Sequence, residues 1–323
     1  KVAFNAEKHW KNLIVFVVLI LFLYIFGVLY VGWQDVWKSF QRIGVGGFIL
    51  ILSLSLVNYS LRFLRWKYYL SIMKCQISFK DNLMIYLSGF SLAATPGKIG
   101  ELIRSFFLKS KGISYSKSIS VLLTERISDL VALLVLLSVT SLNSIDHPGV
   151  MFAIVSISGI VTFFLFFLKQ DLIVGRLYKL TVVRNWMKLS KILNLILRIS
   201  ADLKVLIKWR YLFFGLVVGV IAWIAESLGF YLIIYLVSDI EVSLIQAIFI
   251  YSLAILVGAL TLLPGGIGSV EVVVLTLLIS FNIGHSEAVA ITVIARITTL
   301  WFGVSIGSLA ILFGGGLNKL GTD

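Results

Sequence analysis

Charge is scarce in this chain of 323 residues: only 13% of its residues are charged, whereas soluble domains carry about 25%. Apolar residues make up 59% of the chain, and its mean hydropathy is +1.03. These values exclude a soluble globular protein and predict an all-α polytopic membrane protein, built from spans of about 20 residues. Because no long polar stretch is left for an aqueous catalytic domain, we expect a single transmembrane domain over residues 1–323.

Metal ligands and disulfide partners are also few. The single cysteine, Cys75, excludes an intramolecular disulfide and a cysteine-based metal cluster. The three histidines lie far apart in the sequence, so we expect no metal site. The chain has no Gly-x-x-x-x-Gly-Lys-Ser/Thr phosphate loop and no Asp-rich metal motif, and no Ser-His-Asp set can be assembled from it. We therefore expect neither a cofactor nor enzyme activity.

Long apolar runs predict six full spans, at residues 12–31, 46–66, 117–142, 149–168, 211–237 and 286–313. The sequence starts at Lys1 rather than Met, and we interpret the run 12–31 as a retained span because it is too long for a signal-peptide core. Two further apolar segments, 82–110 and 246–283, are interrupted by Pro and Gly. The pieces around the first interruption are too short to cross a core of about 30 Å, so both segments are predicted to be re-entrant broken-helix hairpins.

Lys and Arg are concentrated in every second segment between the predicted spans, which places most of them on one side of the membrane. They are dense at residues 1–11, 62–80, 109–117 and 169–210, whereas residues 141–149, 238–243 and 281–286 have none. The positive-inside rule then predicts a protein of the cell (cytoplasmic or inner) membrane with both termini cytoplasmic. This asymmetry explains most of the net charge of +13, so no nucleic-acid partner is expected. The amphipathic segment 184–210 either lies in the headgroup layer or packs under the bundle.

The two interrupted segments share one pattern. In the first, the run from Pro96 to Gly100 is followed by Glu101, and Arg126 comes 25 positions later. The second has a similar run from Pro264, and Arg296 comes 25 positions after Glu271. Three full spans separate the segments, and an odd number reverses the side from which the chain enters. The halves 82–142 and 246–313 are therefore predicted to form an inverted repeat, as in secondary transporters; a duplication kept for packing alone is the alternative.

Charged residues inside spans cost about 2.5–3.5 kcal/mol each, so they are candidates for a functional site. Glycines at the two breaks let backbone N–H groups face an anion, and nearby basic side chains would strengthen such a site. An Arg in each half could hold a phosphate bidentately. The predicted substrate-binding residues are Pro96, Gly97, Lys98, Gly100, Glu101, Arg104, Glu125, Arg126, Asp129, Pro264, Gly265, Gly266, Gly268, Glu271 and Arg296.

The acidic residues admit several interpretations. Glu101 and Glu271 could clamp the arginines, cap the half-helices, bind a cationic headgroup or titrate as proton-coupling groups. Glu226 is also a candidate for proton coupling, because burial without a partner disfavours its charged form. A bond from Glu226 to a neighbouring helix is the alternative.

Two further charged groups are interpreted from local patterns. Arg126 and Asp129 are three positions apart on one predicted span and can neutralise each other. Arg62 and Arg65 stand beside Trp66 and two tyrosines, a combination typical of the membrane interface. We therefore expect these two arginines in an interface belt.

Three motifs together resemble the family of lysylphosphatidylglycerol synthase transmembrane regions, also called flippase-like membrane proteins. They lie at residues 96–104, 125–129 and 263–271, and the resemblance covers nearly the whole chain. In the multiple peptide resistance factor, such a region is fused to a soluble aminoacyl-transferase domain and moves the aminoacylated lipid across the membrane. Other relatives stand alone and have been linked to polyprenyl-phosphate-linked glycans. This sequence ends at Asp323 without a transferase domain, so the resemblance implies translocation rather than synthesis.

The prediction is a flippase for a phosphate-headgroup lipid: a phospholipid, an aminoacyl-phospholipid or a polyprenyl-phosphate-linked glycan. Its expected partners are the membrane and an anionic or phosphate-headgroup lipid, and a homo-oligomer or a lipid-biosynthetic partner is left open. One alternative is a membrane-embedded lipid-modifying enzyme that uses Glu101, Glu271 or Asp129 as acid or base. An ion-coupled carrier of a small anion and a scaffold for a biosynthetic complex are the others.

Overall fold

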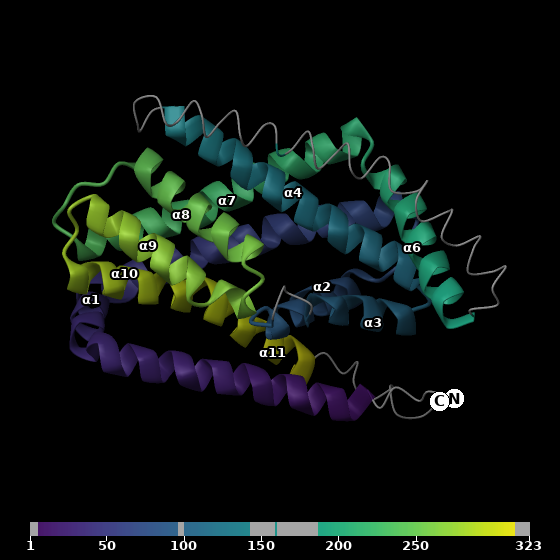
Figure 1. Ribbon diagram of the computed structural model, residues 1–323, viewed down its shortest axis with the longest axis horizontal. Coiled ribbons are helices and arrows are strands. Elements are labelled where there is room, and N and C mark those ends of the chain that lie inside the picture. The colour runs from purple at the N-terminus through teal and green to yellow at the C-terminus, as the bar shows by residue number, and fades with distance from the viewer. Residues whose placement is uncertain (1–5, 96–99, 143–158, 160–186, 314–323) are drawn as a thin grey trace.

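The computed structural model describes residues 6–95, 100–142, 159 and 187–313, and within these ranges the regular elements are all helical (Figure 1). This confirms the all-α prediction. In chain order the elements are α1 (Ala6–Ile72), α2 (Phe79–Ser88), η1 (Gly89–Leu92), α3 (Ile103–Ser110), α4 (Tyr115–Leu142), α6 (Met187–Leu206), α7 (Trp209–Val237), α8 (Leu244–Leu260), η3 (Pro264–Gly266), α9 (Ser269–Ser280), α10 (His285–Arg296), η4 (Ile297–Trp301) and α11 (Phe302–Phe313).

The first two predicted spans, 12–31 and 46–66, both lie within α1. This element has 67 residues, which corresponds to about 100 Å of helix and far exceeds the thickness of a bilayer. Figure 1 shows that its ribbon turns back on itself at one end of the molecule. The connecting residues 32–45 are helical as well, and Gly44 among them has a φ of 64°, a left-handed conformation that glycine adopts without strain. The sequence therefore predicts two separate spans where the structure has one bent element.

Three helical stretches of the described residues are long and apolar enough to cross a membrane: Trp33–Ile72, Trp209–Val237 and His285–Phe313. The last two match the predicted spans 211–237 and 286–313. Helix α4 matches the predicted span 117–142 in length, and it carries two buried carboxylates and one partly buried arginine near its middle. The predicted span 149–168 lies outside the described residues except for residue 159, so the number of six spans stays a prediction.

The predicted hairpins are two pairs of short helices, α2 with α3 and α8 with α9. Their lengths of 8 to 17 residues correspond to about 12–26 Å, less than the hydrocarbon core. In Figure 1 the two pairs approach from opposite ends of the long axis, and their broken ends meet near the centre. A Cβ atom on Gly265 would lie 3.2 Å from the Cα atom of Ala94, so the two backbones touch. The inverted-repeat interpretation stays a prediction.

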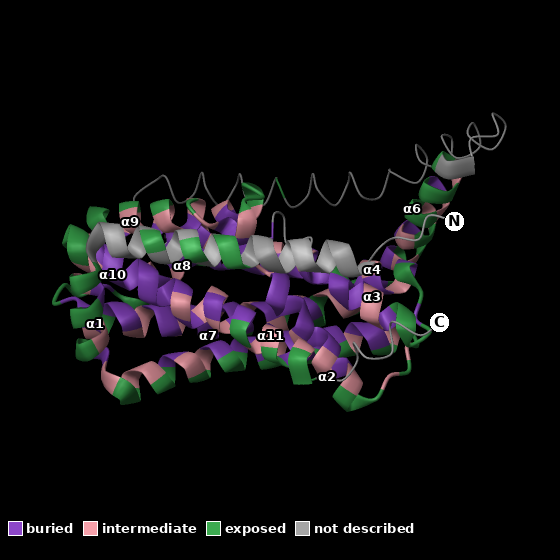
Figure 2. Cartoon of the chain, turned by 90° about the horizontal axis from the view of Figure 1, so that it is seen from below, coloured by how far each residue is buried: buried purple, intermediate pink, exposed green. Residues whose placement is uncertain are grey.

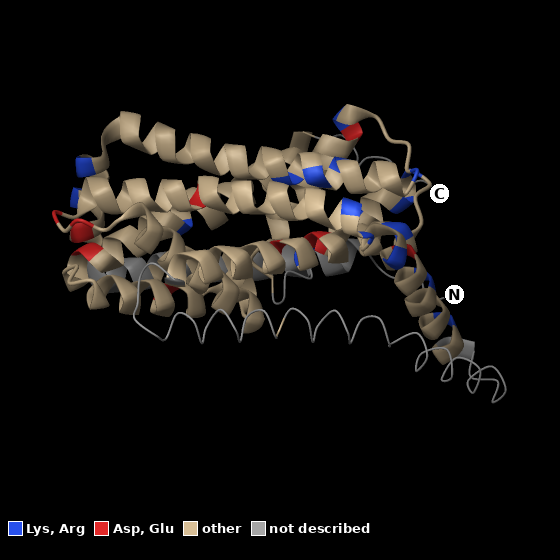
Figure 3. Cartoon of the chain, turned by 90° about the horizontal axis from the view of Figure 1, so that it is seen from above, with Lys and Arg blue, Asp and Glu red and all other residues tan. Residues whose placement is uncertain are grey.

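The core is built mainly from α4, α7, α8, α9 and α10, whose buried side chains form one apolar cluster. Figure 2 shows the buried residues concentrated along the middle of these helices. Helix α6 packs against α4: Leu203 and Leu206 are buried, and the Ser120 hydroxyl of α4 donates a hydrogen bond to the Ile199 carbonyl at 3.0 Å. Among the described residues, most Lys and Arg lie toward one end of the molecule (Figure 3), a distribution that agrees with the charge asymmetry of the sequence.

A surface ion pair closes the base of the first hairpin, outside the predicted membrane segment. The Lys111 ammonium lies 2.9 Å from an Asp81 carboxylate oxygen, and both side chains are nearly half exposed. This hydrogen bond holds the pKa of Asp81 below its usual range, so its stabilisation is present above the ordinary pKa of an aspartate and disappears as the pH falls through the lowered value. Because the pair is exposed and screened, we expect Asp81→Asn to cost less than about 1 kcal/mol in thermal unfolding, and less still at high salt.

Candidate functional site

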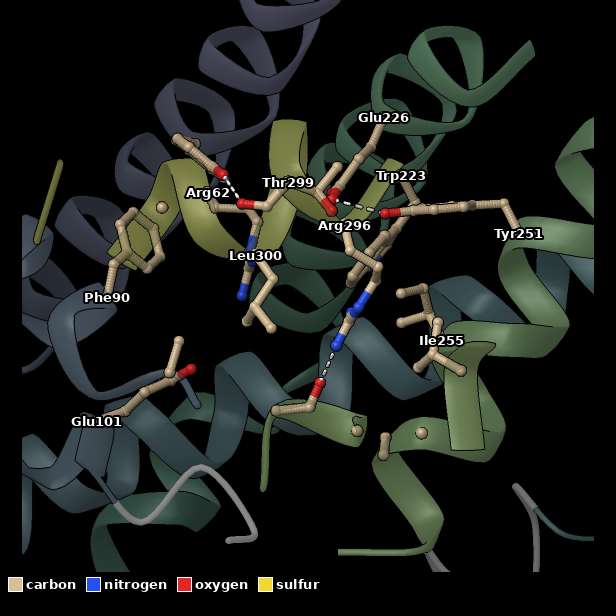
Figure 4. A pocket seen from close by; sticks show the side chains of 18 residues that line it. Arg62, Phe90, Glu101, Trp223, Glu226, Tyr251, Ile255, Arg296, Thr299 and Leu300 are labelled. Carbon is tan, nitrogen blue, oxygen red and sulfur yellow. Dashed lines mark hydrogen bonds between the residues drawn. The ribbon is translucent and has the colours of Figure 1, made fainter. Parts of the chain in front are cut away.

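A central cavity of about 100 Å³ lies where the two broken hairpins meet α1, α7 and α10 (Figure 4). Five predicted residues line it: Glu101, Glu226, Gly265, Gly266 and Arg296. Sequence reasoning missed further polar or aromatic residues of its wall, of which the most informative are Tyr59, Arg62, Trp223 and Tyr251. The sequence shows these four residues only as single polar or aromatic residues within apolar runs. They come together from helices that are distant in sequence, so their shared position in the cavity could not be predicted.

Arg296 holds the second break together from within the cavity wall. Its Nε donates a hydrogen bond to Glu271 Oε1 at 2.8 Å, and its terminal nitrogen donates another to the Gly265 carbonyl at 2.5 Å. The other carboxylate oxygen of Glu271 accepts from the Gly268 N–H at 2.7 Å. Glu271 therefore clamps the arginine and caps α9 at the same time, two of the roles that the sequence left open.

The hydrogen bonds at the second break engage backbone N–H groups that the sequence predicts to face an anion. The N–H of Gly266 donates to the Leu263 carbonyl, and that of Ile267 donates to the carbonyl of Pro264. Together with the capped N–H of Gly268, these groups are engaged within the chain. An anion that enters the cavity would therefore meet the Arg296 side chain rather than a ring of backbone N–H groups.

The first break has the matching pair, but its arginine lies elsewhere. Arg126 lies 3.4 Å from Glu101 and also 3.4 Å from Asp129. The N–H of Gly100 donates to the Thr95 hydroxyl at 2.7 Å, which orders the described side of the break. Glu101 lines the central cavity, whereas Arg126 does not. The structure thus pairs each Arg with the Glu that lies 25 positions before it, a pairing that the sequence left open. Three of the predicted residues, Pro96, Gly97 and Lys98, lie outside the described residues.

The expectation of an interface belt at Arg62 and Arg65 is wrong. Arg62 is 6% exposed and Arg65 is fully buried. Both reach Asp129 of α4, at 3.3 Å from Arg62 and 2.6 Å from Arg65. The physical reason is that the buried Asp129 of α4 pairs with both guanidinium groups, so they can lie inside the bundle rather than at the membrane interface. The guanidinium of Arg62 also lies 5.6 Å from the ring centre of Trp223, within the range of a cation–π contact, and it faces the cavity.

Arg104 and Glu125 form a separate, fully buried pair with a distance of 3.2 Å. The guanidinium of Arg104 lies 4.2 Å from the ring centre of Tyr86, with Trp66 and Phe90 also within 6 Å. Neither charged residue lines the central cavity. Their place indicates that they fasten the first hairpin to α4, which differs from the expectation that Arg104 strengthens an anion site at the break.

Glu226 has the partner that the alternative interpretation foresaw. The Tyr251 hydroxyl of α8 donates a hydrogen bond to Glu226 Oε1 at 2.9 Å across two helices. Close by, residues 297–301 form a turn of π-helix, η4, directly after Arg296. Tyr59 and Ser55 of α1 donate to the carbonyls of Thr299 and Thr298, at 2.5 Å and 2.9 Å. Such turns are frequent at functional sites, and this one places Thr299 in the cavity wall.

The remaining predicted residues lie near the cavity without lining it. Pro264 opens η3, and Gly268 precedes α9 with a φ of 90°. No cluster of three or more metal-ligating side chains occurs among the described residues. The predicted amphipathic segment 184–210 contains α6, whose outer face carries exposed Ile192 and Leu189 beside basic residues.

Comparisons with known proteins give a family. The profile described as "Lysylphosphatidylglycerol synthase TM region" matches residues 12–307. A UPF0104 membrane protein of Pyrococcus horikoshii is 22% identical over 94% of this chain and 97% of its own length. Another of Methanocaldococcus jannaschii is 26% identical over 68% of this chain and 92% of its own, and one of Methanothermobacter thermautotrophicus is 33% identical over 29% of this chain and 28% of its own. The match to the profile includes both hairpins and every residue that lines the cavity.

Proposed function

We propose that this integral multi-pass membrane protein, which belongs to the lysylphosphatidylglycerol synthase transmembrane-region family, is a flippase for a lipid with a phosphate headgroup. The observation that carries the proposal is the central cavity between the two broken hairpins, which Arg62 and Arg296 both line. Arginine suits this role because its planar guanidinium binds phosphate oxygens and stays charged when buried. The family match itself supports a lipid-related role and leaves the lipid open.

The cavity offers a polar path for a headgroup beside an apolar wall for the chain attached to it. Ile255, Ala259 and Leu300 line the same cavity as the two arginines. The contact between Gly265 and Ala94 lies where the two hairpins touch, so movement of either hairpin would open the cavity toward one side. We propose that the hairpins open in alternation, that the protein lies in the cell membrane with both termini cytoplasmic, and that it catalyses no chemical change in the lipid.

A second candidate is an ion-coupled carrier of a small anion. The volume of about 100 Å³ is well below the 300–1,000 Å³ of typical ligand pockets, so an isolated phosphate fits it better than a glycan does. Only the phosphate of a lipid would need to enter the cavity, which keeps the flippase as the first proposal.

Blocking the cavity tests the proposed function. Ala259 lines the cavity on α8, whereas its neighbour Leu260 is exposed, so Ala259→Trp and Leu260→Trp are matched variants. In proteoliposomes with fluorescently labelled phosphatidic acid, we expect the Ala259→Trp variant to lose at least nine-tenths of the translocation measured by dithionite quenching, because indole fills the site, and Leu260→Trp to keep it.

Three further measurements separate the alternatives. Mass spectrometry of the recovered lipid would show a product if the protein were an enzyme. Uptake of radioactive inorganic phosphate without lipid movement would indicate the anion carrier. Equal translocation by the two tryptophan variants would remove the cavity from the pathway.

A further inference from the structure

Glu226 shares the central cavity with the two arginines that would bind the anion. It lies on α7, its side chain is buried, and Figure 4 shows it beside Arg296 on one side of the cavity. The hydroxyl of Tyr251 holds it in place with a hydrogen bond of 2.9 Å. An ionised carboxylate at this position competes with an incoming anion for electrostatic interaction with Arg62 and Arg296.

Among the described residues, five other charged or titratable groups line the same cavity as Glu226. These groups are Tyr59 and Arg62 of α1, Tyr251 of α8, Arg296 of α10 and Glu101 beside the first break, with Asp129 of α4 behind Arg62. The cavity wall thus contains two fixed cations and two carboxylates. Its charge changes by one unit whenever a carboxylate takes up a proton.

We infer that the central cavity takes up a proton together with its anion and that Glu226 is the group that receives it. This inference rests on the proposed function. While the cavity is empty, Arg62 and Arg296 favour the ionised carboxylate. A bound phosphate diester takes over the interaction with the arginines, and its own charge repels Glu226, so the carboxylate accepts a proton from the solvent side. By linkage, the proton strengthens anion binding by the same factor as the anion strengthens proton binding.

The ion pairs of the other two candidates make them less suited to this role. Glu101 lies 3.4 Å from Arg126, and Glu271 lies 2.8 Å from Arg296 and also caps α9. Protonation of Glu101 would leave Arg126 with Asp129 as its only ion-pair partner among the described residues, and protonation of Glu271 would weaken both its pair with Arg296 and its cap on α9. A proton on Glu226 leaves the ion pairs at both breaks intact. The structure therefore selects one of the three proton-coupling candidates of the sequence.

Calorimetry of the purified full-length chain with dibutyl phosphate tests the inference. This diester has a single fixed negative charge, so any proton taken up on binding belongs to the protein. Titrations in two buffers with different ionisation enthalpies, repeated between about pH 5 and pH 8, give the affinity and the number of protons. Repulsion between the diester and an ionised Glu226, taken as two unit charges about 6 Å apart at an effective dielectric constant near 20, would weaken the binding of the diester by roughly a hundredfold. We expect the wild-type protein to lose up to this factor as the pH rises and to take up at most one proton.

Three variants decide the assignment. Glu226→Gln keeps an oxygen for the Tyr251 hydroxyl, and we expect it to bind the diester at every pH with the affinity of the wild type at low pH and no proton uptake. Glu287→Gln, in the first turn of α10 and outside the cavity, should behave as the wild type. Tyr251→Phe keeps the carboxyl but removes its donor, so the midpoint of the pH dependence should move to higher pH.

The opposite results are distinguishable. Unchanged proton uptake in Glu226→Gln, an unshifted midpoint in Tyr251→Phe, or binding without proton uptake in the wild type would overturn the inference and leave the flippase proposal in place. Failure of the wild type to bind the diester at any pH would overturn the anion site, and this inference with it.

Discussion

Replacing Asp129 with alanine is expected to lower the free energy of unfolding by about 3–5 kcal/mol, the usual cost of removing one partner from a buried ion pair. Asp129 is 5% exposed and lies within 3.4 Å of Arg62, Arg65 and Arg126. Without the carboxylate, Arg65 stays fully buried beside other cations. Thermal unfolding of the detergent-purified variant and its yield from membranes measure the effect.

The control for this prediction is Asp81→Asn, which removes an exposed carboxylate from a pair with one lysine and should change stability little. A second substitution shows whether the cost is electrostatic. The single variant Asp129→Asn is compared with the double variant Asp129→Asn/Arg65→Met. The double variant has one buried cation fewer, so it should regain part of the stability that Asp129→Asn loses. If Asp129→Ala unfolds at the wild-type temperature, the buried cluster does not stabilise the fold.

The sequence predicts the two breaks because each leaves a local signature. Pro and Gly interrupt an apolar run, and the spacing from Glu to Arg appears twice, so the sequence marks Glu271 and Arg296 as related residues, whereas their pairing is seen only in the structure. Helix boundaries follow in the same way from the length of the apolar runs. The sequence places a connection between the first two predicted spans but does not predict that it is helical, because its polar residues and the glycines at 44, 46 and 47 are typical of a loop; of these glycines, only Gly44 has a left-handed φ.

The roles of the other arginines could not be predicted, since they depend on contacts between distant parts of the chain. Arg62 and Arg65 carry aromatic neighbours in the sequence, which favours an interface position, yet their partner Asp129 lies 67 and 64 positions away. Likewise, both Arg126 and Arg296 follow a broken hairpin, but only the second lines the cavity. A repeat in sequence therefore marks corresponding residues in each half and does not predict which half supplies the site.

The second large effect is expected at Arg62, because the arginines that line the cavity should matter more for transport than those that do not. We expect Arg62→Gln to lose most of the lipid translocation. Arg62 faces the cavity, and a charge-assisted hydrogen bond to a buried phosphate contributes about 1.5–3 kcal/mol, so we expect the rate of lipid translocation to fall by about 10- to 100-fold. The free energy of unfolding should fall less in Arg62→Gln than in Asp129→Ala, because Asp129 keeps two of its partners, Arg65 at 2.6 Å and Arg126 at 3.4 Å. The measurement is the dithionite assay in proteoliposomes, normalised to the amount of folded protein.

Arg65→Gln is the matched control, since Arg65 lies one turn further along α1 and shares the carboxylate of Asp129 but does not line the cavity. We expect it to lower the unfolding temperature and to keep most of the translocation per folded molecule. Arg126→Gln should likewise retain more translocation than Arg62→Gln, although the sequence repeat alone would give Arg126 the same importance as Arg296. Equal losses in all three variants would mean that the arginines act only through the shared carboxylate, and the cavity would then need another group to bind the anion.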